Sequence, residues 1–134
     1  MAMDLYAEEI LSHYERPHNK GKMENPSVEM HNYNPVCGDD LTIYLKVNKN
    51  RVEDIKFDGS GCAISMATAS MLTDYLKNKS LGEIEKMDVR ALIELIGIDP
   101  GPARLKCATL SLRTAKEATF IYEHKEVDAE TKEL

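Results

Sequence analysis

The hydrophobic pattern changes its period near residue 60, and this change limits the fold more than any other feature. Residues 41–47 read LTIYLKV, in which every second side chain is aliphatic. A period of two predicts a strand with one buried face. From Ala63 onward, apolar residues recur at spacings of three and four, which predicts helices. Strands are therefore expected just before this point and helices after it.

Two further segments complete a predicted antiparallel meander. Val28 and Met30 alternate with polar residues and predict a short strand. The turn NKN then leads into residues 51–57, whose alternation slips between Val52 and Ile55. A slip of this kind is typical of a β-bulge. We therefore expect three strands that follow one another in the chain.

The helical segments surround this meander. Asp4 is expected to cap a first helix that runs to about residue 16 and ends before Pro17. The later segments are a helix from 63 to 76, a short turn capped by Ser80, a helix from 89 to 96 capped by Asp88, and a last helix from 103 to 122. Because the strands are grouped and most helices follow them, we predict an α+β fold, a small three-stranded antiparallel sheet with helices packed on one face.

Length and composition indicate one globular domain. The chain has 134 residues, 43% of them hydrophobic and 30% charged, and we expect residues 1–124 to form the domain. Residues 125–134 show no apolar period and are expected to be a solvated tail. The net charge of −6 disfavours nucleic-acid binding, and no apolar run is long enough to cross a membrane. The N-terminus lacks the features of an export or mitochondrial signal, so we expect a cytoplasmic protein.

The three cysteines are the candidate reactive groups. Cys37 lies in a Pro/Gly turn before the clearest strand, Cys62 follows a glycine at the start of a helix, and Cys107 lies near the start of the last helix beside Lys106. A thiol near a helix N-terminus or a cation has its thiolate form favoured. An odd number of cysteines in a chain expected to be cytoplasmic argues against a disulfide framework.

The residues alone leave the role of these thiols open. They could be buried packing residues, one reactive thiol, or metal ligands. Their spacing is no guide, because 24 residues separate the first two cysteines and 44 separate the second and third, unlike a CxxC motif. His13 is expected at an interface or on the surface. The other histidines are expected to be solvated, and they are His18, His31 and His124.

Four segments occur together and in order along nearly the whole chain. They are ILSHYERPHNKG (10–21), NPVCGDDLTIYLKV (34–47), FDGSGCAISMATASML (57–72) and RLKCATL (104–110). Together these segments resemble the U-type iron-sulfur cluster assembly scaffolds, the IscU/SufU family, to which the N-terminal domain of NifU is related. The resemblance implies the same α+β fold and a shared site at one exposed end of the molecule. Its ligands would be Cys37, Asp39, Cys62 and Cys107.

The resemblance implies one of two functions, and neither makes the chain an ordinary enzyme. As a scaffold, it would accept persulfide sulfur from a cysteine desulfurase on Cys107, bind iron, build a labile [2Fe-2S] cluster and transfer it to apo iron-sulfur proteins. As a SufU-type carrier, it would hold Zn²⁺ and accept the sulfur on Cys37. Gly38 and Gly61 would shape the site, and Lys106 would favour the thiolate or the anionic cluster. A homodimer with cluster bound is left open.

The chain combines features of both branches of the family. Lys106 stands where the IscU branch has a histidine, and the segments GCAIS and KCATL resemble the corresponding segments of SufU. The 44 residues between the second and third cysteines leave no room for the insertion that SufU proteins usually carry. The chaperone-recognition motif of IscU is replaced by DPGPARLK (99–106), which argues against a dedicated Hsp70-type partner.

Overall fold

A computed structural model describes residues 3–134 and contains one antiparallel sheet of three strands in the order β1-β2-β3. The strands are β1 (Val28–Asn34), β2 (Asp39–Asn48) and β3 (Arg51–Ser60). The β2–β3 connection uses Lys49 and Asn50, both with positive φ, as two-residue hairpins require. The predicted meander is therefore confirmed.

The predicted β-bulge is also present. Lys46 pairs with Asp54, whereas the next residue of β2, Val47, pairs with Val52. Glu53 is thus the extra residue on β3, inside the segment where the apolar alternation slips. The bulge lets both Val52 and Ile55 face the core, because it restores the alternation on either side of Glu53.

The helices agree closely with the predicted segments. They are α1 (Met3–Glu15), α2 (Ala63–Leu76), α3 (Leu81–Glu85), α4 (Val89–Ile96), the 3-10 turn η1 (Pro102–Arg104), α5 (Leu105–Tyr122) and α6 (Ala129–Lys132). Ser80 and Glu83 form a capping box on α3, and Asp88 caps α4. α1 begins at Met3 and includes Asp4, which we expected to precede it as a cap. α5 begins two residues later than predicted, because residues 102–104 form the 3-10 turn.

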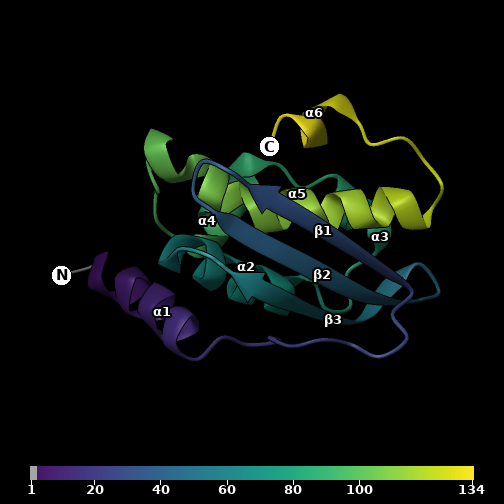
Figure 1. The fold of residues 1–134 in the computed structure, drawn as a ribbon, viewed down its shortest axis with the longest axis horizontal. Helices are drawn as coiled ribbons and strands as arrows, with labels where there is room; N and C mark the ends of the chain where they lie inside the picture. Colours follow the sequence, from purple (N-terminus) through teal and green to yellow (C-terminus); the bar gives the residue numbers. More distant parts are fainter. Residues whose placement is uncertain (1–2) are drawn as a thin grey trace.

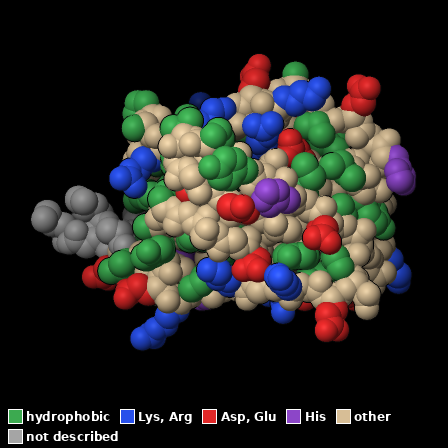
Figure 2. Space-filling view, in the orientation of Figure 1, with side chains coloured by type: hydrophobic (Ala, Val, Ile, Leu, Met, Phe, Trp, Pro, Cys, Tyr) green, Lys and Arg blue, Asp and Glu red, His purple; other side chains and the backbone are tan. Residues whose placement is uncertain are grey.

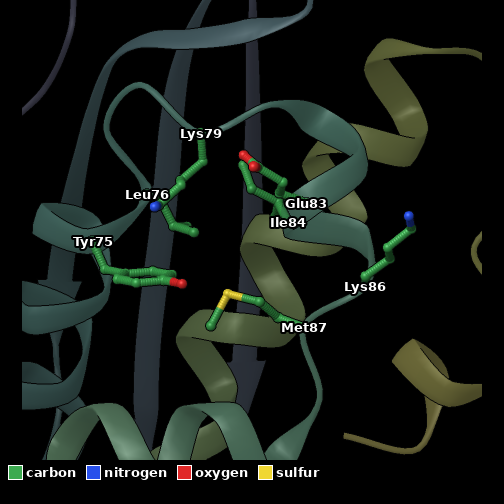
Figure 3. A pocket seen from close by; sticks show the side chains of 7 residues that line it. All are labelled: Tyr75, Leu76, Lys79, Glu83, Ile84, Lys86 and Met87. Atoms are coloured by element: carbon green, nitrogen blue, oxygen red, sulfur yellow. The ribbon is translucent and has the colours of Figure 1, made fainter.

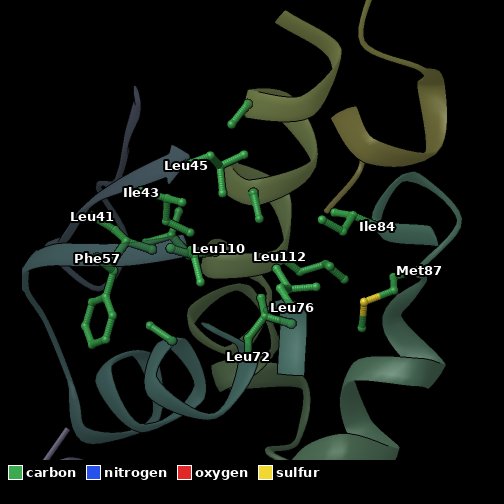
Figure 4. Close-up of a cluster of buried hydrophobic side chains, with 14 of the residues drawn as sticks. Leu41, Ile43, Leu45, Phe57, Leu72, Leu76, Ile84, Met87, Leu110 and Leu112 are labelled. Carbon is green, nitrogen blue, oxygen red and sulfur yellow. The ribbon is translucent and has the colours of Figure 1, made fainter. Parts of the chain in front are cut away.

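The core lies between the sheet and the helices behind it, chiefly α2 and α5 (Figure 1). The inward residues of β2 and β3 interdigitate with aliphatic side chains from α2, α3 and α5 (Figure 4). The fully buried members include Leu41, Ile43, Phe57, Leu72 and Leu112. α1 packs beside α2 through a smaller cluster that includes Ile10 and Met71. The α+β prediction, with helices on one face of the sheet, is confirmed.

The edge of β3 that faces away from β2 forms backbone hydrogen bonds with two loops. The Phe57 N–H donates to the Asn19 carbonyl at 3.0 Å, and the Gly21 N–H donates to the Phe57 carbonyl at 2.8 Å. Farther along the strand, Val52 makes two further backbone hydrogen bonds with residues 78–79. The loop after α1 and the loop after α2 thus both lie against this edge.

The expectation of a solvated C-terminal tail is wrong. Residues after His124, which has a φ of 59°, turn back along α5 and form α6 (Figure 1). The Thr131 side chain is buried, and Leu134 joins the main core cluster. A four-residue helix is too short to produce an apolar period, so the pattern gave no sign of this contact.

Charges of both signs are mixed on the exposed face of the sheet (Figure 2). On the face of the sheet that Figure 2 shows, acidic and basic side chains are interspersed rather than gathered by sign. None of the helices that the structure describes is long and apolar enough to cross a bilayer.

Candidate metal centre

Three of the four predicted ligands meet at one end of the sheet. Cys37 lies in the turn between β1 and β2, Asp39 is the first residue of β2, and Cys107 is the third residue of α5. One ligand atom from each lies within 4.8 Å of the others. The antiparallel pairing of β1 with β2 places their connecting turn over the N-terminal end of α5. Residues 70 positions apart in the sequence therefore share one site.

Asp39 is the most constrained member of the site. Its side chain is fully buried, and Oδ1 accepts a hydrogen bond from the Cys62 N–H at 2.8 Å. Oδ2 accepts from the Ser65 hydroxyl at 2.7 Å. Both donors belong to the N-terminal turn of α2, where free backbone N–H groups and the helix dipole favour a carboxylate. Asp39 therefore anchors the start of β2 to α2.

Cys62 contributes to the site in a different way. It is the N-cap of α2, and its Sγ accepts a hydrogen bond from the Ser65 N–H at 3.4 Å. Its sulfur does not belong to the group formed by Cys37, Asp39 and Cys107. Cys62 is half-buried, and it is the free thiol of the three cysteines. The structure brings its backbone to Asp39, while its sulfur stays with its own helix.

Cys37 and Cys107 are joined by a disulfide, with their Cα atoms 6.8 Å apart. This corrects our expectation that the cysteines form no disulfide. The number of cysteines and the expected compartment do not indicate how close the fold brings two of them. In the disulfide neither sulfur is a thiolate, so metal binding or sulfur acceptance by this pair first requires reduction to two thiols.

Glycine is needed at two positions of the site, for a different steric reason at each. A Cβ at Gly61 would lie 2.9 Å from Asp39 Cγ and still closer to Oδ1, so any larger residue displaces the carboxylate. Gly38 has a φ of 71°, in the left-handed region, and completes the turn between Cys37 and Asp39. Gly61 therefore leaves room for the Asp39 carboxylate at the N-terminal end of α2, and Gly38 provides the turn that leads into Asp39.

Lys106 makes a contact that its sequence context did not predict. Its ammonium donates to the Glu133 carbonyl oxygen at 2.7 Å, which ties α5 to the C-terminal segment. Successive residues on a helix point about 100° apart, so a neighbour in sequence need not face Cys107. The electrostatic role expected for Lys106 stays a prediction.

The two bridged cysteines differ in accessibility. Cys107 is only 2% exposed, whereas Cys37 is half-buried in a turn whose neighbours face solvent. Val36 is 84% exposed, the highest value among the large hydrophobic residues of the described chain, and Tyr33 is exposed as well. Cys37 is therefore the more accessible of the two bridged cysteines.

Ser65 is a site residue that sequence reasoning missed. Besides its contact with Asp39, its hydroxyl oxygen lies 3.0 Å from the Cys107 carbonyl oxygen, so it sits where β2, α2 and α5 meet. A serine three residues after an N-cap inside an apolar helix pattern is an ordinary signal. Only the identity of its partner, a buried carboxylate from another element, reveals its importance.

A separate surface hollow of about 250 Å³ lies between the end of α2 and α3 (Figure 3). Two of its charged groups are already engaged, because Lys79 Nζ lies 4.6 Å from the Tyr75 ring centre and the Glu83 carboxylate accepts from the Ser80 N–H. No cysteine or histidine occurs among the described residues that line it. This hollow therefore lacks the thiol ligands that the cysteine end provides.

Comparisons with known proteins identify the family of the chain. A family model described as the NifU-like N terminal domain matches residues 5–129. The chain is 38% identical over 121 residues to a protein of Archaeoglobus fulgidus named iron-sulfur cluster assembly scaffold protein IscU 1, which covers 90% of this chain and 78% of that one. It is also 38% identical over 130 residues to a Bacillus subtilis protein named zinc-dependent sulfurtransferase SufU. That match covers 84% of this chain and 88% of the Bacillus subtilis protein.

The fold is shared with solved structures as well. The N-terminal part of a NifU-like protein from Brucella abortus superposes with a TM-score of 0.79, over 92% of this chain and 97% of that chain, at 18% identity. This likeness concerns the fold, and the sequence relatives identify the family. Because the family model covers nearly the whole chain, the protein belongs to the NifU-like N-terminal domain family, together with its IscU and SufU relatives.

Proposed function

We propose that this chain is a scaffold on which a labile [2Fe-2S] cluster is built and from which the cluster passes to acceptor proteins. The observation that carries the proposal is the grouping of Cys37, Asp39 and Cys107 within 4.8 Å, beside the helix N-terminus that bears Cys62. The name of the Archaeoglobus fulgidus relative supports it. The cluster is cargo, and the chain is not itself an enzyme in this proposal.

The donor set fits the proposed cargo. Three thiolates and one carboxylate supply four ligands for a [2Fe-2S] cluster, and the same set suits tetrahedral Zn²⁺. The pair of Cys37 and Cys107 must first take up two electrons and two protons from a thiol reductant, and the Cys62 sulfur must turn away from the Ser65 N–H. A carboxylate is a harder ligand than thiolate and holds such a cluster more weakly, which suits a donor.

Sulfur acceptance needs one free thiolate. The thiolate attacks the outer sulfur of the desulfurase persulfide, a new S–S bond forms on this chain, and the desulfurase cysteine leaves as a thiolate. Under the scaffold proposal we assign this role to Cys107. The partners are then a cysteine desulfurase and apo iron-sulfur proteins, and the proposed site of action is the cytoplasm, where thiols are kept reduced.

The accessibility of Cys37 favours a second candidate function. A zinc-dependent sulfur carrier would accept sulfur on Cys37, which is half-buried, rather than on Cys107, which is 2% exposed. The Bacillus subtilis relative bears the name of such a protein. In this candidate the donor set would hold Zn²⁺ as a Lewis-acidic centre, and the chain's own contribution would be the exposed turn around Cys37.

One reconstitution experiment separates the two candidates. The reduced protein is incubated without oxygen with a cysteine desulfurase, cysteine, ferrous iron and a thiol reductant, which together with the iron supplies the electrons that convert persulfide sulfur to sulfide. A scaffold is expected to develop charge-transfer absorption with iron and sulfide in equal amounts, and to pass both to an apo acceptor. Stoichiometric zinc, strong activation of the desulfurase and no transferable cluster would contradict the scaffold proposal.

Persulfide mapping by mass spectrometry adds an independent measurement. Under the scaffold proposal, Cys107→Ser is expected to abolish the persulfide on this chain, and Cys37→Ser is expected to retain it. A persulfide found only on Cys37 would instead favour the zinc-dependent carrier.

A further inference from the structure

A second cluster of metal-binding side chains lies far from the cysteines. His13 in the last turn of α1, His18 in the following loop and Asp74 in α2 each place a ligand atom within 4.8 Å of the others. The two imidazole ring centres are 4.5 Å apart. α1 and α2 lie side by side (Figure 1), so residues about 60 positions apart meet here. We propose that His13, His18 and Asp74 form a second metal site, which takes one late first-row divalent ion such as Zn²⁺.

The two histidines are already oriented by neighbouring groups. His13 Nδ1 lies 2.6 Å from the Ser70 hydroxyl, which leaves His13 Nε2 without a partner among the described contacts. The same hydroxyl oxygen accepts a hydrogen bond from the backbone N–H of His18 at 2.7 Å, which fixes the loop that carries His18. Metal-binding histidines are typically held in this way, because a hydrogen bond at one ring nitrogen presents the other nitrogen to the ion.

The carboxylate of Asp74 is oriented from the opposite side. The Asn19 amide donates to Asp74 Oδ1 at 2.9 Å, and it also donates to the Thr73 hydroxyl at 3.0 Å. Oδ2 is thereby directed to His18 Nδ1, which lies 2.5 Å away. A hydrogen bond between these two atoms holds one proton. A metal ion can replace that proton and bind both atoms.

The movement that this replacement requires is small. Ligand atoms of a tetrahedral zinc site, at bonds of about 2.0–2.1 Å, lie about 3.4 Å from one another. His18 and Asp74 must therefore separate by about 1 Å, and their side chains, 54% and 43% exposed, have room to do so. Two imidazoles and one carboxylate then leave a fourth position for water. Imidazole donors favour Zn²⁺, Ni²⁺ and Cu²⁺ over Mg²⁺ or Ca²⁺.

The surroundings also favour a cation. A surface hollow of about 280 Å³ opens beside His13 and Asp74, and Glu9 lines it one helical turn before His13. Its described lining contains two carboxylates and no lysine or arginine. The ion therefore has an open approach from solvent with a negative potential along it.

This site is independent of the cysteine centre. Cys62 and Asp74 lie 12 residues apart on the α2 segment, which corresponds to about 18 Å at the rise of an α-helix. The inference therefore does not depend on the proposed scaffold function. Its physical consequence would be a metal clip that ties α1 and its loop to α2.

The chain provides its own matched control. His31 Nε2 and Asp40 Oδ1 also form a histidine–carboxylate pair, 2.8 Å apart and about as exposed, but no third ligand joins them among the described residues. His18→Asn removes the ligand and keeps an amide donor for Asp74. His31→Asn makes the same change at the control pair. Both changes lie on the surface, so each variant is expected to fold.

The test follows histidine ring signals by long-range ¹H–¹⁵N NMR while Zn²⁺ is added to the reduced full chain, up to three equivalents. We expect the His13 and His18 ring nitrogens to shift together, and those of His31 and His124 to stay in place. His18→Asn should weaken this binding about tenfold or more, and His31→Asn should leave it unchanged. The site would be refuted by zinc uptake with no change at His13 and His18, or by equal affinity in His18→Asn. Because the signals report only on histidines, the result does not depend on whether the cysteine centre binds zinc.

Discussion

Ser65 holds Asp39 in place: its hydroxyl donates to the buried carboxylate over 2.7 Å and joins the third residue of α2 to the first residue of β2. The Cys62 N–H donates to the other carboxylate oxygen. Asp39 is therefore a structural anchor of the site, whether or not it also binds a metal. Any substitution at this position changes both properties, and the experiments must separate them.

Ser65→Ala is expected to lower the free energy of unfolding by about 1–3 kcal/mol, because it leaves a buried carboxylate oxygen without its donor. Urea unfolding of the reduced protein, followed by circular dichroism, measures this difference. Ser111→Ala is the matched control, since its buried hydroxyl has no hydrogen-bond partner among the described residues. That variant should be neutral or slightly more stable. Equal losses in both variants would show that the Ser65–Asp39 contact has no special weight.

Asp39→Ala is expected to lengthen the lifetime of a bound cluster and to slow its transfer several-fold, because it removes the carboxylate, a hard ligand that binds the cluster weakly. The measurement is the rate of transfer to an apo acceptor, followed by visible circular dichroism. Ser65→Ala serves as the comparison, since it loosens the anchor and keeps the carboxylate. If transfer is as fast in Asp39→Ala as in the unchanged protein, the argument for lability is wrong.

Leu134→Ala is expected to cost about 2–4 kcal/mol, the usual loss for a buried leucine that leaves a cavity. Leu134 is buried in the main core, whereas Leu11 on α1 is 55% exposed. Leu11→Ala should therefore change stability by less than about 0.5 kcal/mol. Chemical unfolding of both variants under the same conditions gives the comparison. A Leu134→Ala variant as stable as Leu11→Ala would mean that the C-terminal segment is not packed in solution.

The pH dependence of stability should carry a contribution from Glu85. Burial, followed by the hydrogen bond and charge of Glu123, raises the pKa of Glu85 from 4.5 to about 7. The folded state therefore holds a proton that the unfolded state releases at lower pH. Stability should fall as pH rises from about 4.5 to about 7 and then level off, by at most about 3 kcal/mol and by less where solvent screens the pair.

Glu85→Gln removes this titration and should flatten the profile over that range, so that the variant is more stable than the unchanged protein at pH 8. Glu94→Gln changes an exposed carboxylate on α4 and is the control, with a profile close to that of the unchanged protein. Unfolding midpoints measured from pH 4.5 to 8 test the prediction. A slope retained in Glu85→Gln would assign the pH dependence to other groups.

Local signals predicted most of the fold because each was strong by itself. The alternation in residues 41–47 indicated β2, the slip after Val52 indicated the bulge, and Ser80 and Asp88 marked two helix starts. α6 was missed because a four-residue helix has no period. The C-terminal segment is buried through Thr131 and Leu134, whose partners lie elsewhere in the sequence.

The candidate site was only partly predictable for a related reason. The motifs around Cys37, Asp39 and Cys107 suggested which residues belong together, and the structure groups these three. It keeps the Cys62 sulfur with its own helix and gives Lys106 a partner in the C-terminal segment. Side-chain direction and long-range pairing depend on the packing of several elements, and a linear sequence does not contain that geometry.

The backbone pairing along the edge of β3 bears on how the protein avoids aggregation. An exposed strand edge is a template on which another chain can add a strand. Here Asn19 covers one part of the edge with its carbonyl, while its side chain holds Asp74. Loss of the contacts between the α1 loop and α2 would therefore uncover β3, and the first sign of damage to this region would be self-association rather than unfolding.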